Sequence, residues 1–220
     1  MIKAKIKIHA IQLVAIAAFG LGSCVSLNSH QTGRTVGKDN ISFLGSFNFG
    51  YSDSEQYFAA ADSGVFFIGE IGNYFGIGEN IDIGLKVNSS LHLTGMSKFQ
   101  IIGDKKSTFA SSVGVDIGVT PHVLILSALN YTGSLSLFNS IHPTDYFAVT
   151  FSPRYTYLCF TNFTEKDGCT VRNNIFGYSA GFLMGTKHQF SVELSQYVSN
   201  TAFSFISKPI VSLGYIWHIK

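Results

Sequence analysis

The sequence of 220 residues has little charge: Asp, Glu, Lys and Arg make up only 13% of it, whereas hydrophobic residues make up 46%. It contains four prolines, three cysteines and one tryptophan. The formal net charge of +2 is too small to attract nucleic acid or an anionic membrane surface. We therefore expect no nucleic-acid partner. A chain with so few charges is hard to keep in water unless lipid or protein covers its apolar surface.

The first 23 residues have no acidic side chain, and Lys3, Lys5 and Lys7 precede the mainly apolar run 11–21. A membrane-spanning helix needs about 20 apolar residues, and this run has about half that length. We interpret residues 1–23 as a secretory signal peptide. Its removal would change the formal net charge from +2 to −1 because three lysines leave with it.

The junction 21–24, LGSC, resembles the lipobox of bacterial lipoproteins. The resemblance implies that Cys24 becomes the mature N-terminus and carries a diacylglycerol and a fatty acyl chain such as palmitate. Buried acyl chains contribute about 0.8 kcal/mol per CH2 group, which anchors a protein durably. Residues 24–40 are then a lipidated N-terminus followed by a polar, turn-rich periplasmic linker. The alternative is an ordinary leader with a chance cysteine at its end.

From residue 41 to residue 220, apolar and polar side chains alternate with period two, which is typical of strands with two different faces. The alternation is clearest in 81–93, 108–119, 146–159, 190–195 and 211–219. Less regular strand candidates are 41–51, 64–75, 96–103, a stretch within 122–141, and 174–184. These segments predict about ten strands, within a range of eight to twelve because 122–141 could contain another hairpin.

The connections between these segments are short at one end and long at the other. The short turns are 76–80, 103–107, 142–145 and 185–189, and the long loops are 52–63, 160–173 and 199–208. This pattern is typical of a transmembrane barrel with short periplasmic turns and longer extracellular loops. We predict an all-β fold over 41–220: a closed, antiparallel, up-and-down transmembrane β-barrel. An even strand count returns both of its ends to the periplasmic side.

The two faces of the predicted strands indicate which face contacts lipid. Phe, Tyr, Leu and Ile dominate one face, whereas Gly, Ala and Ser with isolated charges dominate the other. A lumen of about ten strands is narrow, so small residues fit its inside. The rings then face lipid, with Tyr155, Tyr157, Tyr215 and Trp217 near strand ends where interfacial girdles form. The alternative is a lipocalin-like soluble barrel on a lipid tether.

Five stretches of the mature chain are similar to small outer-membrane β-barrel proteins of Bacteroidota, including those with a lipoprotein leader. They are 31–40 (QTGRTVGKDN), 76–87 (GIGENIDIGLKV), 99–109 (FQIIGDKKSTF), 142–155 (HPTDYFAVTFSPRY) and 185–194 (GTKHQFSVEL). The resemblance implies residence in the outer membrane, with outer-membrane lipid as the surroundings. It also implies that an acidic stretch after the lipidated cysteine would direct such a protein to the cell surface. Residues 25–31 have no acid, so the anchor is expected in the periplasmic leaflet.

The remaining cysteines, Cys159 and Cys169, flank the short segment FTNFTEKDG. An oxidising compartment permits a disulfide between them, and two free thiols are the alternative. No histidine lies near them in sequence, so we expect no metal site there. Apart from the lipid on Cys24, we expect no cofactor.

Charged residues on the predicted lumen faces form a candidate network. Its acids are Asp82, Asp116 and Glu193, its bases are Lys86, Lys98 and Arg154, and Glu70 is a further candidate. A buried unpaired charge costs several kcal/mol, so balanced signs in a narrow lumen favour ion pairs and a plugged interior. The functional alternative is a proton-transfer or ion-selective site made of the same charges.

Three functions follow from these features. The first is a non-enzymatic outer-membrane lipoprotein with a structural or accessory role, which binds another outer-membrane protein complex. The second is a narrow channel or transport barrel. The third is a barrel hydrolase that acts on lipid or peptide, but no Ser–His–acid pattern supports catalytic residues. The seven histidines are scattered, with His92 and His218 on predicted lumen faces.

Overall fold

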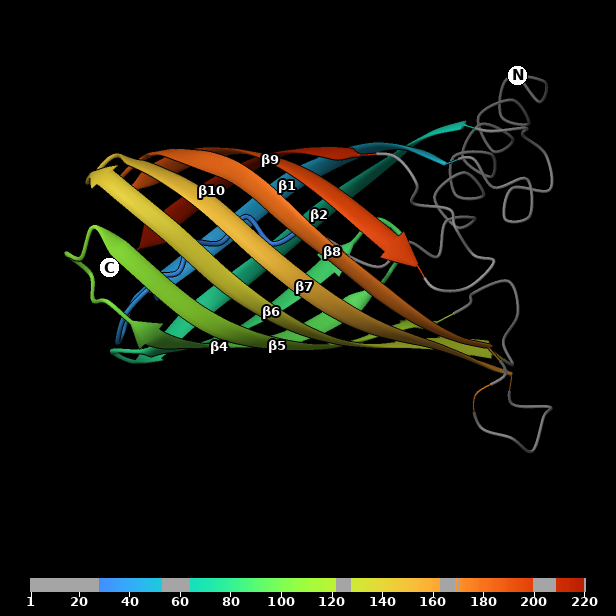
Figure 1. Cartoon of the computed structure of the whole chain (residues 1–220). Coiled ribbons are helices and arrows are strands. Elements are labelled where there is room, and N and C mark those ends of the chain that lie inside the picture. Colours follow the sequence, from blue (N-terminus) through green and yellow to red (C-terminus); the bar gives the residue numbers. More distant parts are fainter. Residues whose placement is uncertain are drawn as a thin grey trace, which may run out of the picture.

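The computed structural model describes residues 28–52, 64–121, 128–162, 169, 171–199 and 209–219. They form a closed barrel of antiparallel strands in the order β1-β10-β9-β8-β7-β6-β5-β4-β3-β2 (Figure 1). The strands are β1 (Ile41–Ser52), β2 (Gly64–Gly78), β3 (Ile81–Asn88), β4 (Leu93–Ile102), β5 (Phe109–Pro121), β6 (Ala128–Thr144), β7 (Phe147–Asn162), β8 (Val171–Gly185), β9 (His188–Ser199) and β10 (Ile210–Ile219). The predicted fold class and strand number are confirmed.

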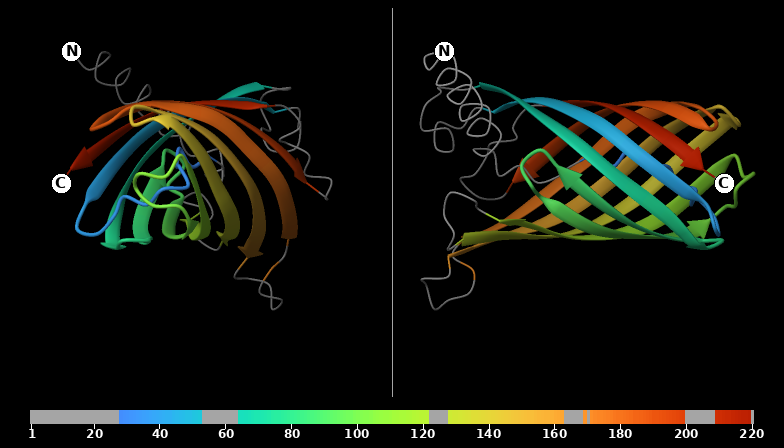
Figure 2. Two further views of the ribbon diagram at one scale, coloured as in Figure 1. Left: turned by 60° about the vertical axis from the view of Figure 1, so that its left-hand side comes forward. Right: turned by 180° about the vertical axis from the view of Figure 1, so that it is seen from behind.

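The barrel closes where the first and last strands pair. β1 pairs with β10 from Ile41 opposite Ile219 to Phe49 opposite Val211. The start of β1 and the last residue of β10 therefore lie on the side of the barrel where the chain turns between β2 and β3, β4 and β5, β6 and β7, and β8 and β9. We call this side the turn end (Figures 1 and 2). The opposite end is called the loop end. None of the described residues belongs to a helix that could span a membrane.

The segment 81–93, expected as one strand, contains a turn instead. β3 ends at Asn88 and β4 begins at Leu93, and Leu91 between them has a positive φ of 61°. The connection has four residues, so the alternation continues across it with the same parity: Asn88 and His92 both face inward. An uninterrupted period-two pattern in the sequence cannot reveal a turn with an even number of residues.

The outer face of the barrel is apolar. Exposed large side chains on it include Phe47, Phe67, Ile117, Leu135, Phe190, Val198 and Leu213. Buried side chains on the lumen face are mostly Ser, Thr, Asn and charged residues. A soluble barrel has the reverse arrangement, so this wall is suited to hydrocarbon.

The lumen contains two apolar layers, one near each end. At the turn end, the layer comprises Leu44, Tyr74, Met96, Ala148, Leu183 and Ile216, with Val36 packed against it. At the loop end, the layer comprises Ile175, Tyr197 and Ile210, with Phe66 and Leu158 packed against it. Glu70, Lys86, Asp116, Arg154 and Glu193 are buried in the lumen as well, and Asp82 and Lys98 lie at the level of the turn-end layer.

The turn between β4 and β5 is stabilised by local hydrogen bonds. In the turn between β4 and β5, the carboxylate of Asp104 accepts hydrogen bonds from the Lys106 backbone N–H and the Ser107 hydroxyl. These two bonds hold the pKa of Asp104 below its ordinary value. Gly103 in this turn has a φ of 82°, a conformation that favours glycine.

A segment inside the lumen as the candidate functional site

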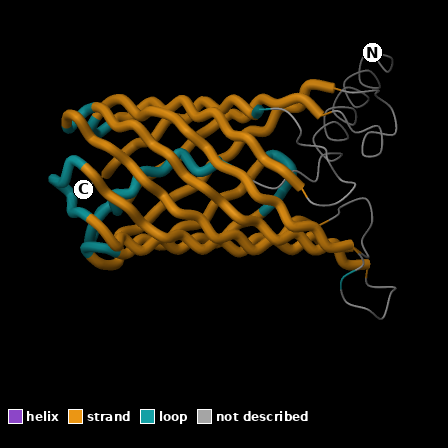
Figure 3. The backbone as a smooth tube through the Cα atoms, viewed as in Figure 1, coloured by secondary structure: helices purple, strands orange, loops and turns teal. Residues whose placement is uncertain are grey.

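A stretch of chain before β1 lies inside the barrel. Residues 28–36, which we call the luminal segment, have no regular secondary structure and run through the lumen to the turn end (Figure 3). Asn28 and His30 are each only 1% exposed. The sequence predicts a periplasmic linker over 24–40, whereas the structure places residues 28–36 inside the barrel. Polar residues suit a linker in water, but in a lumen lined with polar groups they find hydrogen-bond partners instead of water.

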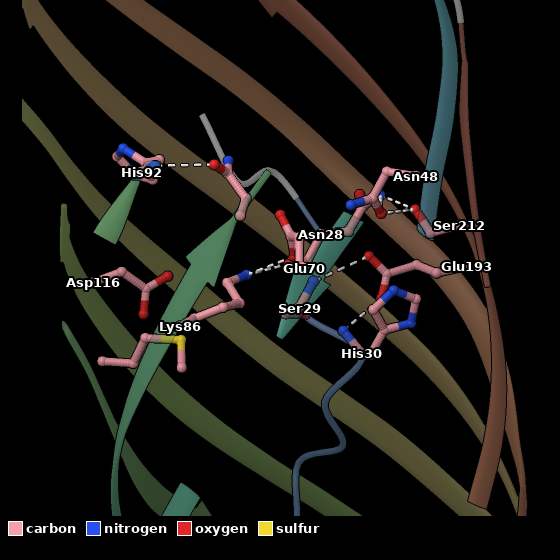
Figure 4. A network of polar contacts seen from close by, with 12 residues as sticks. Asn28, Ser29, His30, Asn48, Glu70, Lys86, His92, Asp116, Glu193 and Ser212 are labelled. Carbon is pink, nitrogen blue, oxygen red and sulfur yellow. Dashed lines mark hydrogen bonds and ion pairs between the residues drawn. The ribbon is translucent and has the colours of Figure 1, made fainter. Parts of the chain in front are cut away.

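In the middle of the barrel, charged side chains of the wall hold the backbone of the luminal segment (Figure 4). The carboxylate of Glu193 accepts hydrogen bonds from the backbone N–H groups of Ser29 and His30, at 3.4 and 3.1 Å. The Nζ of Lys86 donates to the carbonyl oxygen of Asn28 at 2.8 Å. An acid of the wall thus binds two backbone N–H donors, and a base of the wall binds the neighbouring carbonyl acceptor.

The same arrangement recurs nearer the turn end. The carboxylate of Asp82 accepts from the backbone N–H of Val36, with N–O distances of 3.1 and 2.9 Å. The Nζ of Lys98 donates to the carbonyl oxygen of Arg34 at 2.9 Å. Hydrogen bonds to charged groups contribute about 1.5–3 kcal/mol each, so both ends of the segment are firmly held.

Neutral side chains of the wall complete the binding of the luminal segment. The N–H of Gly33 donates to Ser140 Oγ at 2.9 Å, and Ser112 Oγ donates to the Gly33 carbonyl. Further along, the N–H of Thr35 donates to Gln100 Oε1 at 2.9 Å. The wall therefore recognises mainly the backbone of the segment.

Asn28 is the residue whose side chain is held most completely. Its amide nitrogen donates to Asn48 Oδ1 at 2.8 Å and to Ser212 Oγ. Its amide oxygen accepts from Ser195 Oγ at 2.5 Å. These partners come from β1, β10 and β9, so one side chain joins three strands near the place where the barrel closes.

All six charged residues of the predicted network lie in the lumen, together with Glu70. Three ion pairs connect them: Lys98–Asp82 at 3.1 Å, Lys86–Glu70 at 3.3 Å, and Arg154–Asp116. Glu193 binds the backbone of the luminal segment, and it has no ion pair with a basic side chain among the described residues. The sequence missed this partner because residues 28–36 contain no acid and no periodic pattern that would place them in a barrel.

The remaining candidate residues are elsewhere. Cys159, on β7, forms a disulfide with Cys169, and their Cα atoms are 5.7 Å apart. His92 is buried in the lumen, with its ring nitrogens 2.6 Å from Thr120 Oγ1 and 3.2 Å from Thr132 Oγ1. In the described ranges no group of three His, Cys, Asp or Glu could hold a metal ion. Cys24, the predicted lipidation site, lies outside the described residues, as do 53–63 and 163–168 of the long loops.

The architecture is that of the outer-membrane β-barrel proteins. An outer membrane channel from Pseudomonas putida F1 is similar in fold, with a TM-score of 0.56, 6% sequence identity, and coverage of 88% of this chain and 100% of that chain. The NanC porin has a TM-score of 0.48 at 9% identity, over 80% of this chain and 98% of the porin. The N-terminal β-barrel domain of OprF from Pseudomonas aeruginosa has a TM-score of 0.39 at 9% identity, over 83% of this chain and 99% of that domain. No protein-family model and no curated protein sequence matches this chain.

Proposed function

We propose that this chain is an outer-membrane β-barrel lipoprotein whose lumen is closed by its own luminal segment, and that it acts as a structural or accessory subunit without catalysis. The proposal rests on the partners of the charged lumen residues. These residues form ion pairs with one another or hydrogen bonds with the backbone of residues 28–36. Opening the lumen would leave Glu193, Lys86 and Lys98 without their backbone partners in a narrow space. A barrel built in this way favours a closed interior over steady conduction.

The outer wall and the loops are then the surfaces that meet other molecules. The wall is suited to outer-membrane lipid or to another outer-membrane protein complex, because exposed aromatic and aliphatic side chains cover it. Co-purification from native outer membranes in a mild detergent tests the accessory role. A stoichiometric companion protein is the expected result, and isolation of the barrel alone in every mild detergent would count against it.

Planar-bilayer recording tests the closed lumen. We expect the purified wild-type barrel to show no regular conductance steps. Heat-modifiable migration in gel electrophoresis serves as the control that the inserted protein is folded. Steady conductance by folded wild-type protein would refute the proposal of a closed lumen.

The second candidate function is a channel that opens when the luminal segment leaves. Two observations favour it. The segment is held by hydrogen bonds and charges, which water can replace, and the fold resembles that of an outer membrane channel. A variant that lacks residues 28–36 should then conduct, whereas the wild type should not. If the folded deletion variant is silent as well, the channel hypothesis fails.

A hydrolase is the third candidate. Two Ser–His contacts lie near the luminal segment: Ser140 Oγ is 2.8 Å from His142 Nε2, and Ser191 Oγ is 2.9 Å from His30 Nδ1. The Ser140 hydroxyl also accepts the Gly33 N–H, and Ser191 contacts the segment itself. We interpret both pairs as structural hydrogen bonds. A lipid or peptide hydrolysis activity lost on His142→Ala or His30→Ala substitution would contradict this interpretation.

A further inference from the structure

The luminal segment has a defined direction inside the barrel. Val36 contacts Asp82, one residue from the start of β3 at the turn end. His30 contacts Ser191, three residues from the start of β9. Asn28 contacts partners that each lie seven residues from the turn end of their strands: Asn48 in β1, Ser195 in β9 and Ser212 in β10. The segment therefore rises through the lumen as its residue numbers fall, and its N-terminal end is the one nearer the loop end.

The depth of Asn28 follows from strand geometry. A strand rises about 3.3 Å per residue and is tilted by about 40° in barrels of this kind. Seven residues then correspond to about 18 Å along the barrel axis, compared with an apolar band of about 25 Å. Asn28 thus lies beyond the middle of the membrane when measured from the turn end.

The residues before Asn28 cannot return through the lumen to the turn end, because other residues occupy that path. Residues 29–36 themselves run through that half of the lumen, and Val36 packs against the apolar layer with Leu44, Tyr74 and Ile216. The link from Cys24 to Asn28 spans at most about 14 Å when fully extended. An acyl group on Cys24 therefore cannot reach the leaflet at the turn end while the luminal segment is in place.

Between Asn28 and the loop end, one side of the lumen is polar. The apolar layer near the loop end is made by residues from β7, β8, β9, β10 and β2. Across from it, β5 and β6 carry Thr120 and Thr132, which contact His92 just before β4. A backbone passing along this side has hydrogen-bonding groups beside it.

We propose that the chain is threaded through its own barrel, so that the N-terminus leaves at the loop end, opposite to the C-terminus. In the outer membrane proposed above, the loop end is the cell surface. The N-terminus and any acyl group on Cys24 are then displayed on the outside, in the outer leaflet. This placement replaces the periplasmic leaflet that the missing acidic stretch in 25–31 implied. It rests on the proposed outer-membrane function for the identity of the two compartments, but the sidedness of the N-terminus relative to the loops follows from the lumen alone.

Three insertions of one epitope test the threading. The first is placed between Val25 and Ser26, the second between Lys166 and Asp167 in the loop between β7 and β8, and the third between Lys105 and Lys106 in a short turn. On intact cells we expect antibody to label the first and second insertions and to reach the third only after permeabilisation. An N-terminal epitope that behaves like the epitope in the short turn overturns the proposal.

The same three proteins, refolded into lipid vesicles, report sidedness without export. An N-terminal epitope on the same side as the loop epitope supports threading whichever way the barrel inserts. This arm separates a failure of threading from a failure of the outer-membrane proposal. In the second case only the labelling on cells changes, because the relative sidedness in vesicles stays the same.

A variant with the luminal segment locked in place tests whether antibody labels the N-terminal epitope while residues 28–36 are in the lumen. Asn28 and Ser195 are in hydrogen-bond contact at 2.5 Å, so the double substitution Asn28→Cys/Ser195→Cys places two thiols within reach of a short bifunctional maleimide, which we expect to hold the segment in the lumen. In the locked protein the N-terminal epitope should remain accessible to the same extent as before. If antibody no longer reaches the N-terminal epitope in the locked protein, the molecules labelled before locking had no segment in the lumen, and the proposal is wrong.

Discussion

At the scale of single residues, burial decides how much each ion pair contributes to stability. The Arg154 and Asp116 side chains are 5% and 8% exposed, whereas those of Lys105 and Glu79 are 47% and 69% exposed, with a distance of 3.1 Å between Nζ and Oε2. Water and salt screen the second pair but not the first. The two pairs therefore provide a direct comparison of buried and exposed charge within one protein.

We expect Asp116→Asn to destabilise the barrel by about 3–5 kcal/mol, because the buried guanidinium of Arg154 loses this carboxylate. Lys105→Ala is the matched control and should cost about 0–1 kcal/mol. The free energy of unfolding can be measured by urea titration of the barrel refolded into vesicles. Equal stabilities of the two variants would show that water enters the lumen around Arg154.

At the scale of elements, the luminal segment lies very close to the wall at Gly33. A Cβ atom on this residue would be 2.1 Å from the carbonyl oxygen of Ala110 and 2.9 Å from that of Phe138. Both contacts are with strand backbone, which cannot move without breaking the ladder between β5 and β6. The close approach requires a residue without a side chain.

Gly33→Ala should therefore release the luminal segment while the barrel stays folded. We expect the backbone amides of residues 29–36 to exchange with deuterium at least about tenfold faster, which corresponds to a loss of about 1.4 kcal/mol. Gly45→Ala on β1 is the matched control, because a Cβ there has no atom within 4 Å. Unchanged exchange in Gly33→Ala would mean that the segment is not seated against β5 and β6.

The disulfide is a second feature of this scale, because it connects the end of β7 to the chain just before β8. Its two cysteines are 10 positions apart in the sequence. Crosslinking a loop of that size removes conformational freedom from the unfolded chain that corresponds to about 3 kcal/mol.

We expect Cys159→Ser/Cys169→Ser to lower the free energy of unfolding by about 2–3 kcal/mol, because the loop is no longer closed in the unfolded chain. The same urea titration, run with and without a thiol reductant, measures the change. Reductant should lower the stability of the wild type and leave the double variant unaffected. A wild type that is insensitive to reductant under unfolding conditions would contradict a stabilising role of the disulfide.

At the scale of the whole molecule, the barrel is inverted relative to a soluble protein. Leu213 on β10 is 46% exposed, whereas its neighbour Ser212 is fully buried in the lumen. In a membrane the exposed side chain contacts acyl chains, and the free energy of the fold depends on keeping charge away from that surface.

Leu213→Arg should cost about 2–4 kcal/mol in vesicles, because the residue lies within the apolar band. Phe109→Arg, at the turn-end start of β5, is the control and should cost about 0–1 kcal/mol because the guanidinium reaches the interface. Urea titration in vesicles of one lipid composition compares the two. Equal costs would place the two positions at the same depth, which the register of the barrel does not allow.

The candidate site could be predicted only in part from the sequence. The wall residues of the network can be identified from the sequence, because Asp82, Lys86 and Glu193 occupy the polar positions of alternating strands, opposite to the apolar face. Their pairing cannot, since ion pairs such as Lys98–Asp82 depend on the register between neighbouring strands. The period-two pattern does not show the turn at 89–92, because its four residues preserve the parity of the alternation.

The sequence by itself determined that the chain forms an alternating sheet with one apolar and one small or polar face, because period two is a local property of the chain. It also determined the approximate number of strands, since short connections separate most of them. Only the tertiary structure decided that residues 28–36 lie inside the barrel and which way they run. A polar stretch without periodicity is equally satisfied by water or by a polar lumen. The choice between them depends on wall groups such as Glu193 and Asn48, which become neighbours of this stretch only when the barrel closes.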